Sequence, residues 1–211
     1  VHIVKGSSIS NQANITFEQT DYQFTGDYDD GLGTTVSTAG DVDGDGLDDI
    51  MMGAPMTDLA GQNSGSVYIM LGSTISSNNF ASFEMYSDAD YTMYGSSIND
   101  EIGRALAPAG DIDGDNLSDI LVVALYNDYG GTNTGTAYLF TGASLPYLAV
   151  NTEIAPETAD YRITGDTGIP TLRELSPRPG DLDGDGFDDV MVSTNEANSQ
   201  RGLVNVFTSC D

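Results

Sequence analysis

The strongest constraint on the fold of this chain is a ten-residue acidic segment that returns twice at a fixed spacing. It reads GDVDGDGLDD at residues 40–49, GDIDGDNLSD at 110–119 and GDLDGDGFDD at 180–189. The leading aspartates are 70 residues apart in both intervals. Self-similarity at one period indicates an array of similar structural units. We therefore expect three repeats of about 70 residues, each with one acidic loop.

Each repeat offers four short strands and no periodic segment of helix length. Apolar runs follow the acidic loop (DIMMGAP, DILVVAL and DVMVST), and β-branched and aromatic runs come next (GSVYIML, GTAYLFT and GLVNVFTS). A segment that begins with Asp-Tyr closes the unit (DYTMYG, DYRITG). Four strands per repeat are typical of a β-propeller blade, which buries its faces against neighbouring blades. The sequence therefore predicts an all-β protein of four-stranded antiparallel blades; a linear β-solenoid is disfavoured, because its repeats are far shorter.

The expected blade boundaries follow from matching the strands of one unit to those of the next. Residues 1–26 hold outer strands of a preceding blade, since VHIVKG matches VYIMLG and DYQFTG matches DYTMYG. Blade 1 is expected at 27–95, blade 2 at 96–165 and blade 3, without its last outer strand, at 166–211. Three blades cannot close a ring, because propellers have about four to eight. Either the chain is part of a larger propeller, or other copies complete its open edges by strand exchange.

Each acidic segment is expected to be a calcium-binding loop. Carboxylates at positions 1, 3 and 5 converge if the loop curls around one point, and the carbonyl at position 7 and the carboxylate at position 9 complete an all-oxygen shell. Such a shell favours Ca²⁺ over Mg²⁺. The predicted ligands of three Ca²⁺ ions are Asp41, Asp43, Asp45, Leu47 and Asp49 in the first loop, Asp111, Asp113, Asp115, Leu117 and Asp119 in the second, and Asp181, Asp183, Asp185, Phe187 and Asp189 in the third.

The turn residue and the flanks distinguish these loops from an EF-hand. Position 6 requires a sharp turn and holds residues that tolerate a positive φ: Gly46, Asn116 and Gly186. An EF-hand needs glutamate at position 12 and helices on both sides. Position 12 is instead apolar, in Met52, Val122 and Val192. The remaining alternative, a solvated acidic face without a metal, conflicts with three copies in one register.

The charge balance limits the partners. The chain has 33 acidic and six basic residues, for a formal net charge of −27. Nucleic acid and anionic membrane surfaces need basic patches and are therefore excluded as partners. No apolar run approaches the roughly 20 residues of a membrane-spanning helix, so no membrane insertion is expected. Cations are the natural partners of such a chain.

These motifs resemble the FG-GAP repeats of integrin α-subunit propellers and of related bacterial FG-GAP/VCBS-type surface proteins. MMGAP at 51–55 keeps the GAP triplet, and Leu32-Gly33 and Ile102-Gly103 stand in the place of the FG pair. The resemblance covers nearly the whole chain. It implies a β-propeller with one Ca²⁺ per loop, in which the ions brace the blades and other loops bind ligands. The third unit departs from the pattern, with Pro177 and Pro179 in its first strand.

The resemblance implies a non-enzymatic, extracellular or cell-surface module for adhesion, recognition or surface assembly, with a protein or glycan ligand. The alternative is a structural subunit of an extracellular filament whose blade edges are completed by other copies. A carboxylate-dependent hydrolase is disfavoured, because the glutamates outside the loops form no motif and His2, the one histidine, excludes a Ser-His-Asp triad. The sequon at Asn14 predicts a glycan if the protein is secreted.

Overall fold

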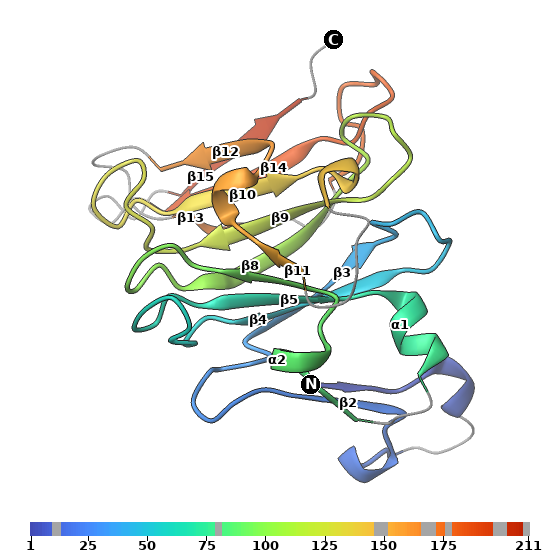
Figure 1. Ribbon diagram of the computed structural model, residues 1–211. Coiled ribbons are helices and arrows are strands. Elements are labelled where there is room, and N and C mark those ends of the chain that lie inside the picture. The colour runs from blue at the N-terminus through green and yellow to red at the C-terminus, as the bar shows by residue number, and fades with distance from the viewer. Residues whose placement is uncertain are drawn as a thin grey trace.

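The computed structural model describes residues 1–9, 14–78, 82–145, 152–165, 172–175, 179–195 and 202–208, and these form four stacked β-sheets (Figure 1). The helical elements are short: α1 (Gly72–Ser77), α2 (Met85–Asp88) and the 3-10 turns η1 (Gly6–Ser8), η2 (Phe17–Gln19), η3 (Gly142–Ser144) and η4 (Pro156–Thr158). No helix in this part of the chain is long and apolar enough to cross a membrane. The predicted all-β class is confirmed.

The two central sheets each contain four consecutive antiparallel strands. The five-stranded sheet has the order β11-β7-β5-β4-β3, and the four-stranded sheet has the order β12-β10-β9-β8. The strands of the first are β3 (Thr35–Gly40), β4 (Asp49–Ala54), β5 (Ser66–Met70) and β7 (Tyr91–Tyr94). Those of the second are β8 (Ile102–Gly110), β9 (Asp119–Ala124), β10 (Thr136–Phe140) and β12 (Tyr161–Thr164).

Smaller sheets lie at both ends of the stack. At the N-terminal end, β1 (His2–Ile3) pairs antiparallel with β2 (Tyr22–Thr25). At the C-terminal end, β13 (Leu172–Leu175), β14 (Val190–Asn195) and β15 (Gly202–Phe207) form a three-stranded antiparallel sheet. Of the two prolines noted in this unit, Pro177 lies outside the described residues. The blade boundaries at residues 26, 95 and 165 stay a proposal.

Two short strands were not predicted. β6 (Ser82–Glu84) pairs in parallel with β2, and β11 (Thr152–Ile154) pairs in parallel with β7. Along the chain, β6 comes between β5 and β7, and β11 comes between β10 and β12. Each nevertheless pairs with the outermost strand of the preceding sheet. Phe83 stands opposite Phe24, and Ile154 opposite Met93. Three residues are too few to show a strand period, so the sequence does not predict that these segments pair with the preceding sheet.

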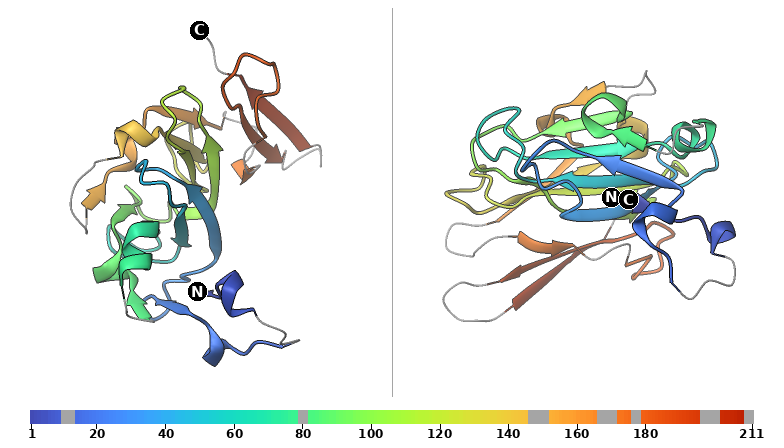
Figure 2. Two further views of the ribbon diagram at one scale, coloured as in Figure 1. Left: turned by 90° about the vertical axis from the view of Figure 1, so that its right-hand side faces the viewer. Right: turned by 90° about the horizontal axis from the view of Figure 1, so that it is seen from below.

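The core lies between the sheets, and alternate residues of one strand enter different layers. In β9, Ile120 and Val122 pack toward the five-stranded sheet, whereas Leu121 and Val123 pack toward the C-terminal sheet. Period-two alternation with both faces buried is expected for a sheet between two others. The four sheets follow one another along an arc (Figure 2).

All three acidic loops lie at the same end of the sheets. Each joins the first strand of its sheet to the second, and the three loops stack at the right-hand side of Figure 1. The connections at residues 26–34 and 55–65 leave the opposite end, because one enters β3 and the other leaves β4. The molecule therefore has an acidic-loop end and an opposite end.

Candidate metal centres

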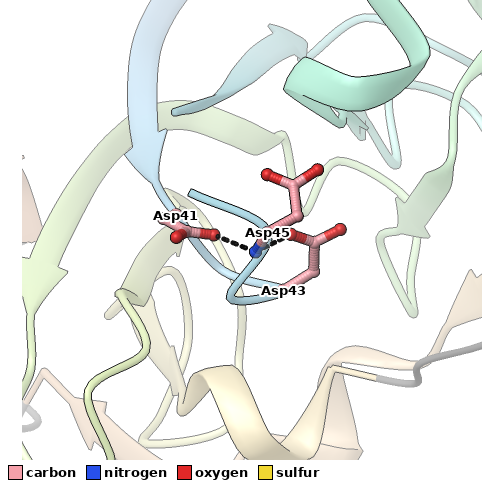
Figure 3. Close-up of side chains that lie close together, drawn as sticks. All are labelled: Asp41, Asp43 and Asp45. Carbon is pink, nitrogen blue, oxygen red and sulfur yellow. Dashed lines mark hydrogen bonds between the residues drawn. The ribbon is translucent and has the colours of Figure 1, made fainter. Parts of the chain in front are cut away.

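Each acidic loop gathers carboxylate oxygens around one point. In the first loop the side chains of Asp41, Asp43 and Asp45 come from a single turn of the chain (Figure 3). The groups whose ligand atoms lie within 4.8 Å of one another are Asp41, Asp43 and Asp45; Asp111, Asp113 and Asp115; and Asp181, Asp183 and Asp189. They are the only such groups of three or more potential ligands among the residues that the structure describes.

The electrostatics of the first loop favour a cation. Burial, followed by the neighbouring charges of Asp45 and Asp41, raises the pKa of Asp43, and the same causes raise the pKa of Asp113 in the second loop. Like charges at this spacing disfavour each other's ionised form. A divalent cation among these oxygens would reverse that effect, because its charge stabilises every carboxylate around it.

The carboxylate at position 1 shapes the loop. Asp41 Oδ1 accepts hydrogen bonds from the amides of Gly44 at 2.7 Å and Asp45 at 3.1 Å, and its Oδ2 accepts one from Gly46 at 2.9 Å. Asp181 holds the third loop with the same three bonds, and Asp111 holds the second with two of them. The loop therefore curls around the first aspartate, as the D-x-D-x-D spacing predicts.

Position 6 has the positive φ that the sequence predicts. The angles are 87° at Gly46, 67° at Asn116 and 98° at Gly186. Position 4 adopts the same region, with 76°, 77° and 83° at Gly44, Gly114 and Gly184. The sequence analysis missed this second turn, although glycine at position 4 in all three copies was a visible signal.

The aspartate at position 9 lies deeper than the others and has a second structural role. Asp49 is fully buried, and its two oxygens accept amides from Val42 at 2.9 Å and Gly72 at 2.8 Å. Asp119 makes the equivalent bonds to Ile112 and Gly142. Burial, with the loop acids adding to it, raises the pKa of each to about 7. Position 9 therefore ties its loop to the second residue after the third strand.

In the third loop the residue equivalent to Gly72 and Gly142 is Ser209, which lies outside the described residues. Asp189 is fully buried, and its Oδ2 accepts the amide of Leu182 at 2.6 Å. Its Oδ1 is buried without a hydrogen-bond partner among the described residues. Since Asp181 and Asp183 lie beside it, the donor set fits a hard cation such as Ca²⁺.

Position 7 has a packing role beyond its predicted carbonyl ligand. The amides of Leu47, Leu117 and Phe187 donate to the position-5 carboxylate of their own loops at 2.8, 2.8 and 2.9 Å. Leu117 also reaches the first loop, where a Cβ on Gly44 would lie 2.9 Å from its Cδ2. Coordination by these three carbonyl oxygens stays a prediction.

Consecutive loops are hydrogen-bonded to each other. The amide of Ser118 donates to the carbonyl of Asp41 at 2.8 Å, and the amide of Asp188 donates to the carbonyl of Asp111 at 2.9 Å. A Cβ on Gly40 would overlap the side chain of Ser118, and one on Gly110 would overlap Asp188. The glycine that opens the first and second acidic segments is thereby explained, since only glycine permits this close approach.

The aspartate of the Asp-Tyr motif is a structural residue that sequence reasoning missed. Asp90 accepts the amide of Leu71 at 2.7 Å and the hydroxyl of Thr74 at 2.8 Å. Asp160 accepts the equivalent groups of Thr141 and Ser144, and Asp21 those of Lys5 and Ser8. Each aspartate thus fixes the chain as it leaves the third strand. The repeat was visible in the sequence, but the partners were not.

A cavity of about 310 Å³ lies at the opposite end of the sheets, between the connections at 26–34 and 55–65. Four aspartates and three tyrosines contribute to its lining: Asp27, Asp29, Asp30, Asp58, Tyr28, Tyr68 and Tyr86. The rings of Tyr28 and Tyr86 are exposed. The predicted glycosylation residue, Asn14, is also exposed and lies shortly before η2.

The chain matches known proteins along most of its length. The model of the FG-GAP repeat family matches residues 32–70. Integrin alpha-PS2 of Drosophila melanogaster is 31% identical over 206 residues, which cover 90% of this chain and 13% of that protein. Integrin alpha-5 of Xenopus laevis and integrin alpha-V of Gallus gallus are each 28% identical, over 91% of this chain and over 16% and 17% of their own lengths.

The chain therefore spans only a small part of the relatives it matches, between 13% and 17% of their length. Within that part, the antiparallel sheets described above correspond to β-propeller blades. The family match, the relatives and the repeated acidic loops agree with one another. The chain therefore contains a match to the FG-GAP repeat at residues 32–70 and is similar over about nine tenths of its length to integrin alpha chains.

Proposed function

We propose that this chain is a non-enzymatic, calcium-binding β-propeller module of the extracellular space or cell surface that serves adhesion, recognition or surface assembly. The observation that carries the calcium site is the convergence of three aspartate carboxylates in each of the three acidic loops, with ligand atoms within 4.8 Å of one another. A cation among these oxygens would offset the repulsion between the carboxylates.

Calcium would act here as a brace between strands. The loop carboxylates at positions 1, 3, 5 and 9 and the carbonyl at position 7 would hold the ion, and position 9 also accepts the amide of Gly72 in the first loop and of Gly142 in the second. The bound ion supplies positive charge at the junction of three strands. Extracellular calcium modules bind with dissociation constants on the order of 10⁻⁴ to 10⁻³ M, and we expect this range.

Equilibrium dialysis against Ca²⁺ at concentrations up to the millimolar range tests the proposal. We expect three bound ions per chain, one for each loop. Far-ultraviolet circular dichroism of the same samples would verify that the chain is folded. Saturation at fewer than three ions in a folded chain would contradict a site in every loop, and no bound ion would remove the calcium role altogether.

The recognition surface in this proposal is the end of the sheets opposite the acidic loops. The cavity there combines aspartates with the exposed rings of Tyr28 and Tyr86, a lining that suits a cationic side chain of a protein ligand. A tri-arginine peptide is a suitable probe. Tyr86→Ala should weaken its binding, whereas Tyr126→Ala, which removes an exposed tyrosine outside this cavity, should not. Equal effects of both variants would indicate attraction by net charge alone.

A structural subunit of a filament is the second candidate, and the C-terminal sheet favours it. Val204 and Val206 of β15 are exposed, on a strand that pairs only with β14 among the described residues. Light scattering with Ca²⁺ and with a chelator separates the two candidates. A large particle that dissociates on chelation would support the filament, whereas a single chain in both conditions would exclude it.

Secretion and glycosylation at Asn14 are part of the proposal. The exposure of Asn14 supports access by a glycosyltransferase. Expression through a eukaryotic secretory pathway should give a chain whose mass falls after glycosidase treatment. An Asn14→Gln variant of unchanged mass, compared with the untreated parent chain, would contradict a glycan at this residue.

A further inference from the structure

Asp188 of the third acidic loop binds both backbone groups of the aspartate that leads the second loop. The amide of Asp188 donates to the carbonyl of Asp111 at 2.9 Å, and Oδ2 of Asp188 accepts the amide of Asp111 at 3.0 Å. Asp188 stands at position 8 of its loop, which is not a predicted ligand position. The third loop therefore places a carboxylate against the start of the second loop.

The space for this carboxylate exists because the residue before Asp111 is glycine. A Cβ on Gly110 would overlap the side chain of Asp188, and Gly110 has a φ of 87°. Any larger residue would displace the carboxylate. Asp188 is half-buried, so solvent and salt screen its charge less than that of a fully exposed acid.

The carboxylate lies beside the residue around which the second loop curls. The side chain of Asp111 accepts two amides of its own loop, and it converges with Asp113 and Asp115. Asp188 thus fixes the backbone that carries Asp111 and adds a negative charge close to this group. A further negative charge near a cation site strengthens binding of the cation.

The first loop has a neutral residue in the corresponding place. Ser118 is position 8 of the second loop, and its amide donates to the carbonyl of Asp41 at 2.8 Å. A Cβ on Gly40 would overlap Ser118, just as one on Gly110 would overlap Asp188. The two contacts between loops therefore share a main-chain hydrogen bond and a close approach to glycine, but they differ by one charge.

The predicted ligands cannot account for any difference in affinity between these two loops. Both sets consist of four aspartates and the carbonyl of a leucine. We propose that Asp188 raises the calcium affinity of the second loop, so that the second loop fills with Ca²⁺ before the first. This inference rests on the calcium role proposed above. Position 8 of one loop then tunes the site in the loop before it.

A protein with one remaining site isolates the second loop. Asp43→Ala combined with Asp183→Ala removes a position-3 carboxylate from each of the other two loops, and isothermal titration calorimetry with Ca²⁺ then measures the second loop alone. Adding Asp188→Asn keeps a side-chain acceptor for the amide of Asp111 and removes the charge. The dissociation constant should rise about threefold to tenfold. An unchanged value would overturn the proposal.

Asp48→Asn is the matched control in the same single-site protein. Asp48 occupies position 8 of the first loop and is exposed. The variant removes the same amount of charge from the chain, and it should leave the dissociation constant of the second loop unchanged. Equal weakening by Asp48→Asn and Asp188→Asn would mean that net charge, rather than the contact with Asp111, controls the affinity.

Salt separates the charge of Asp188 from a merely structural role. From about 0.1 to 1 M NaCl the Debye length falls from about 10 to 3 Å, so the effect of a nearby charge is screened. The ratio of the dissociation constants with and without Asp188→Asn should therefore approach one. A ratio that does not change with salt would show that the side chain only supports the loop.

Ser118→Asp transfers the carboxylate to the first loop. In a protein with Asp113→Ala and Asp183→Ala, the first loop is the site that remains, and Gly40 leaves room beside residue 118. The added Ser118→Asp should lower the dissociation constant by a similar factor. Because this variant is expected to gain affinity, a folding defect cannot produce the expected result. An unchanged or higher dissociation constant would contradict the proposal.

These measurements let the calcium role and its tuning fail separately. Far-ultraviolet circular dichroism would verify that each variant is folded. If neither folded single-site protein binds Ca²⁺, the calcium role fails and this inference fails with it. If both bind Ca²⁺ with affinities that do not depend on residues 188 and 118, the calcium role stands and only the tuning by position 8 is wrong.

Discussion

The carbonyl oxygen of Asp41 accepts a hydrogen bond from the amide of Ser118 at 2.8 Å, which joins the first acidic loop to the second. The equivalent bond joins Asp111 to Asp188 at 2.9 Å. The proposed calcium sites therefore belong to a row of loops in contact rather than to three separate turns.

Gly40→Ala should destabilise the chain through this loop contact. A Cβ at residue 40 would overlap Ser118, and the φ of 73° is itself unfavourable for alanine. Gly180 is the matched control, because it occupies the same position in the third loop with a φ of 82° and has nothing within 4 Å of its Cβ position. We expect a loss of about 1 kcal/mol for Gly180→Ala and roughly 1–3 kcal/mol more for Gly40→Ala. Equal losses in urea unfolding would show that the contact is unimportant.

Asp113→Ala should reduce the number of bound Ca²⁺ ions from three to two, because the variant removes a position-3 carboxylate from the second loop alone. Asp48→Ala is the control, since Asp48 is exposed at position 8 of the first loop and is not a predicted ligand. It should retain all three ions. Loss of every site in Asp113→Ala would instead mean that the hydrogen-bonded loops bind calcium as one unit.

Chelation should lower the melting temperature of the chain. A ligand that binds only the folded state adds RT ln(1 + [L]/Kd), or about 1.4 kcal/mol per site when the free ion is at ten times its dissociation constant. Differential scanning calorimetry in Ca²⁺ and in excess EDTA measures the effect. Mg²⁺ at the same concentration should restore less of the stability, since the loop offers a flexible all-oxygen shell. An identical transition in Ca²⁺ and EDTA would refute the bracing role.

Stability should fall as the pH rises above about 10. Burial raises the pKa of both Tyr68 and Tyr138 to about 12. Between the unfolded and folded pKa values the folded state binds more protons than the unfolded state, so the free energy of unfolding decreases as pH increases. The contribution is fully present below the unfolded value and is lost by pH 12, at up to about 1.4 kcal/mol per pH unit for each tyrosine.

Tyr68→Phe tests this pH dependence, because phenylalanine keeps the ring and removes the titrating hydroxyl. Urea unfolding at several pH values should give a shallower slope for Tyr68→Phe than for the parent chain. Tyr28→Phe, at a ring that is almost fully exposed, should leave the slope unchanged. Parallel slopes for all three proteins would show that ionisation of Tyr68 does not control the alkaline transition.

The sequence predicted those parts of the structure that repeat and that depend on local chemistry. The acidic loops followed from the carboxylate spacing, and the turn at Gly46, Asn116 and Gly186 followed from the residues that tolerate a positive φ. The strands followed from apolar runs of the right length.

The parts that escaped prediction depend on contacts between distant segments. β6 and β11 are strands because they pair with the edge strand of another sheet, and a three-residue segment is too short to predict that pairing. The tie from Asp49 to Gly72 and the tie from Asp90 to Leu71 join residues 19 or more apart in sequence. A single sequence shows that such residues recur, but only their positions in space show which groups they bind.

Because β6 and β11 each pair with the sheet of the preceding repeat, the unit that repeats in the sequence differs from the unit that can fold. A shortened chain that ends at Thr141 would keep every strand of the first 95 residues and yet leave the outer edge of β7 bare, because Ile154 belongs to the following repeat. An ending after Ala159 would retain that cover. Any exchange of repeats between related proteins therefore has to carry a piece of the next repeat with it, or supply one whose apolar residue fits the same neighbour.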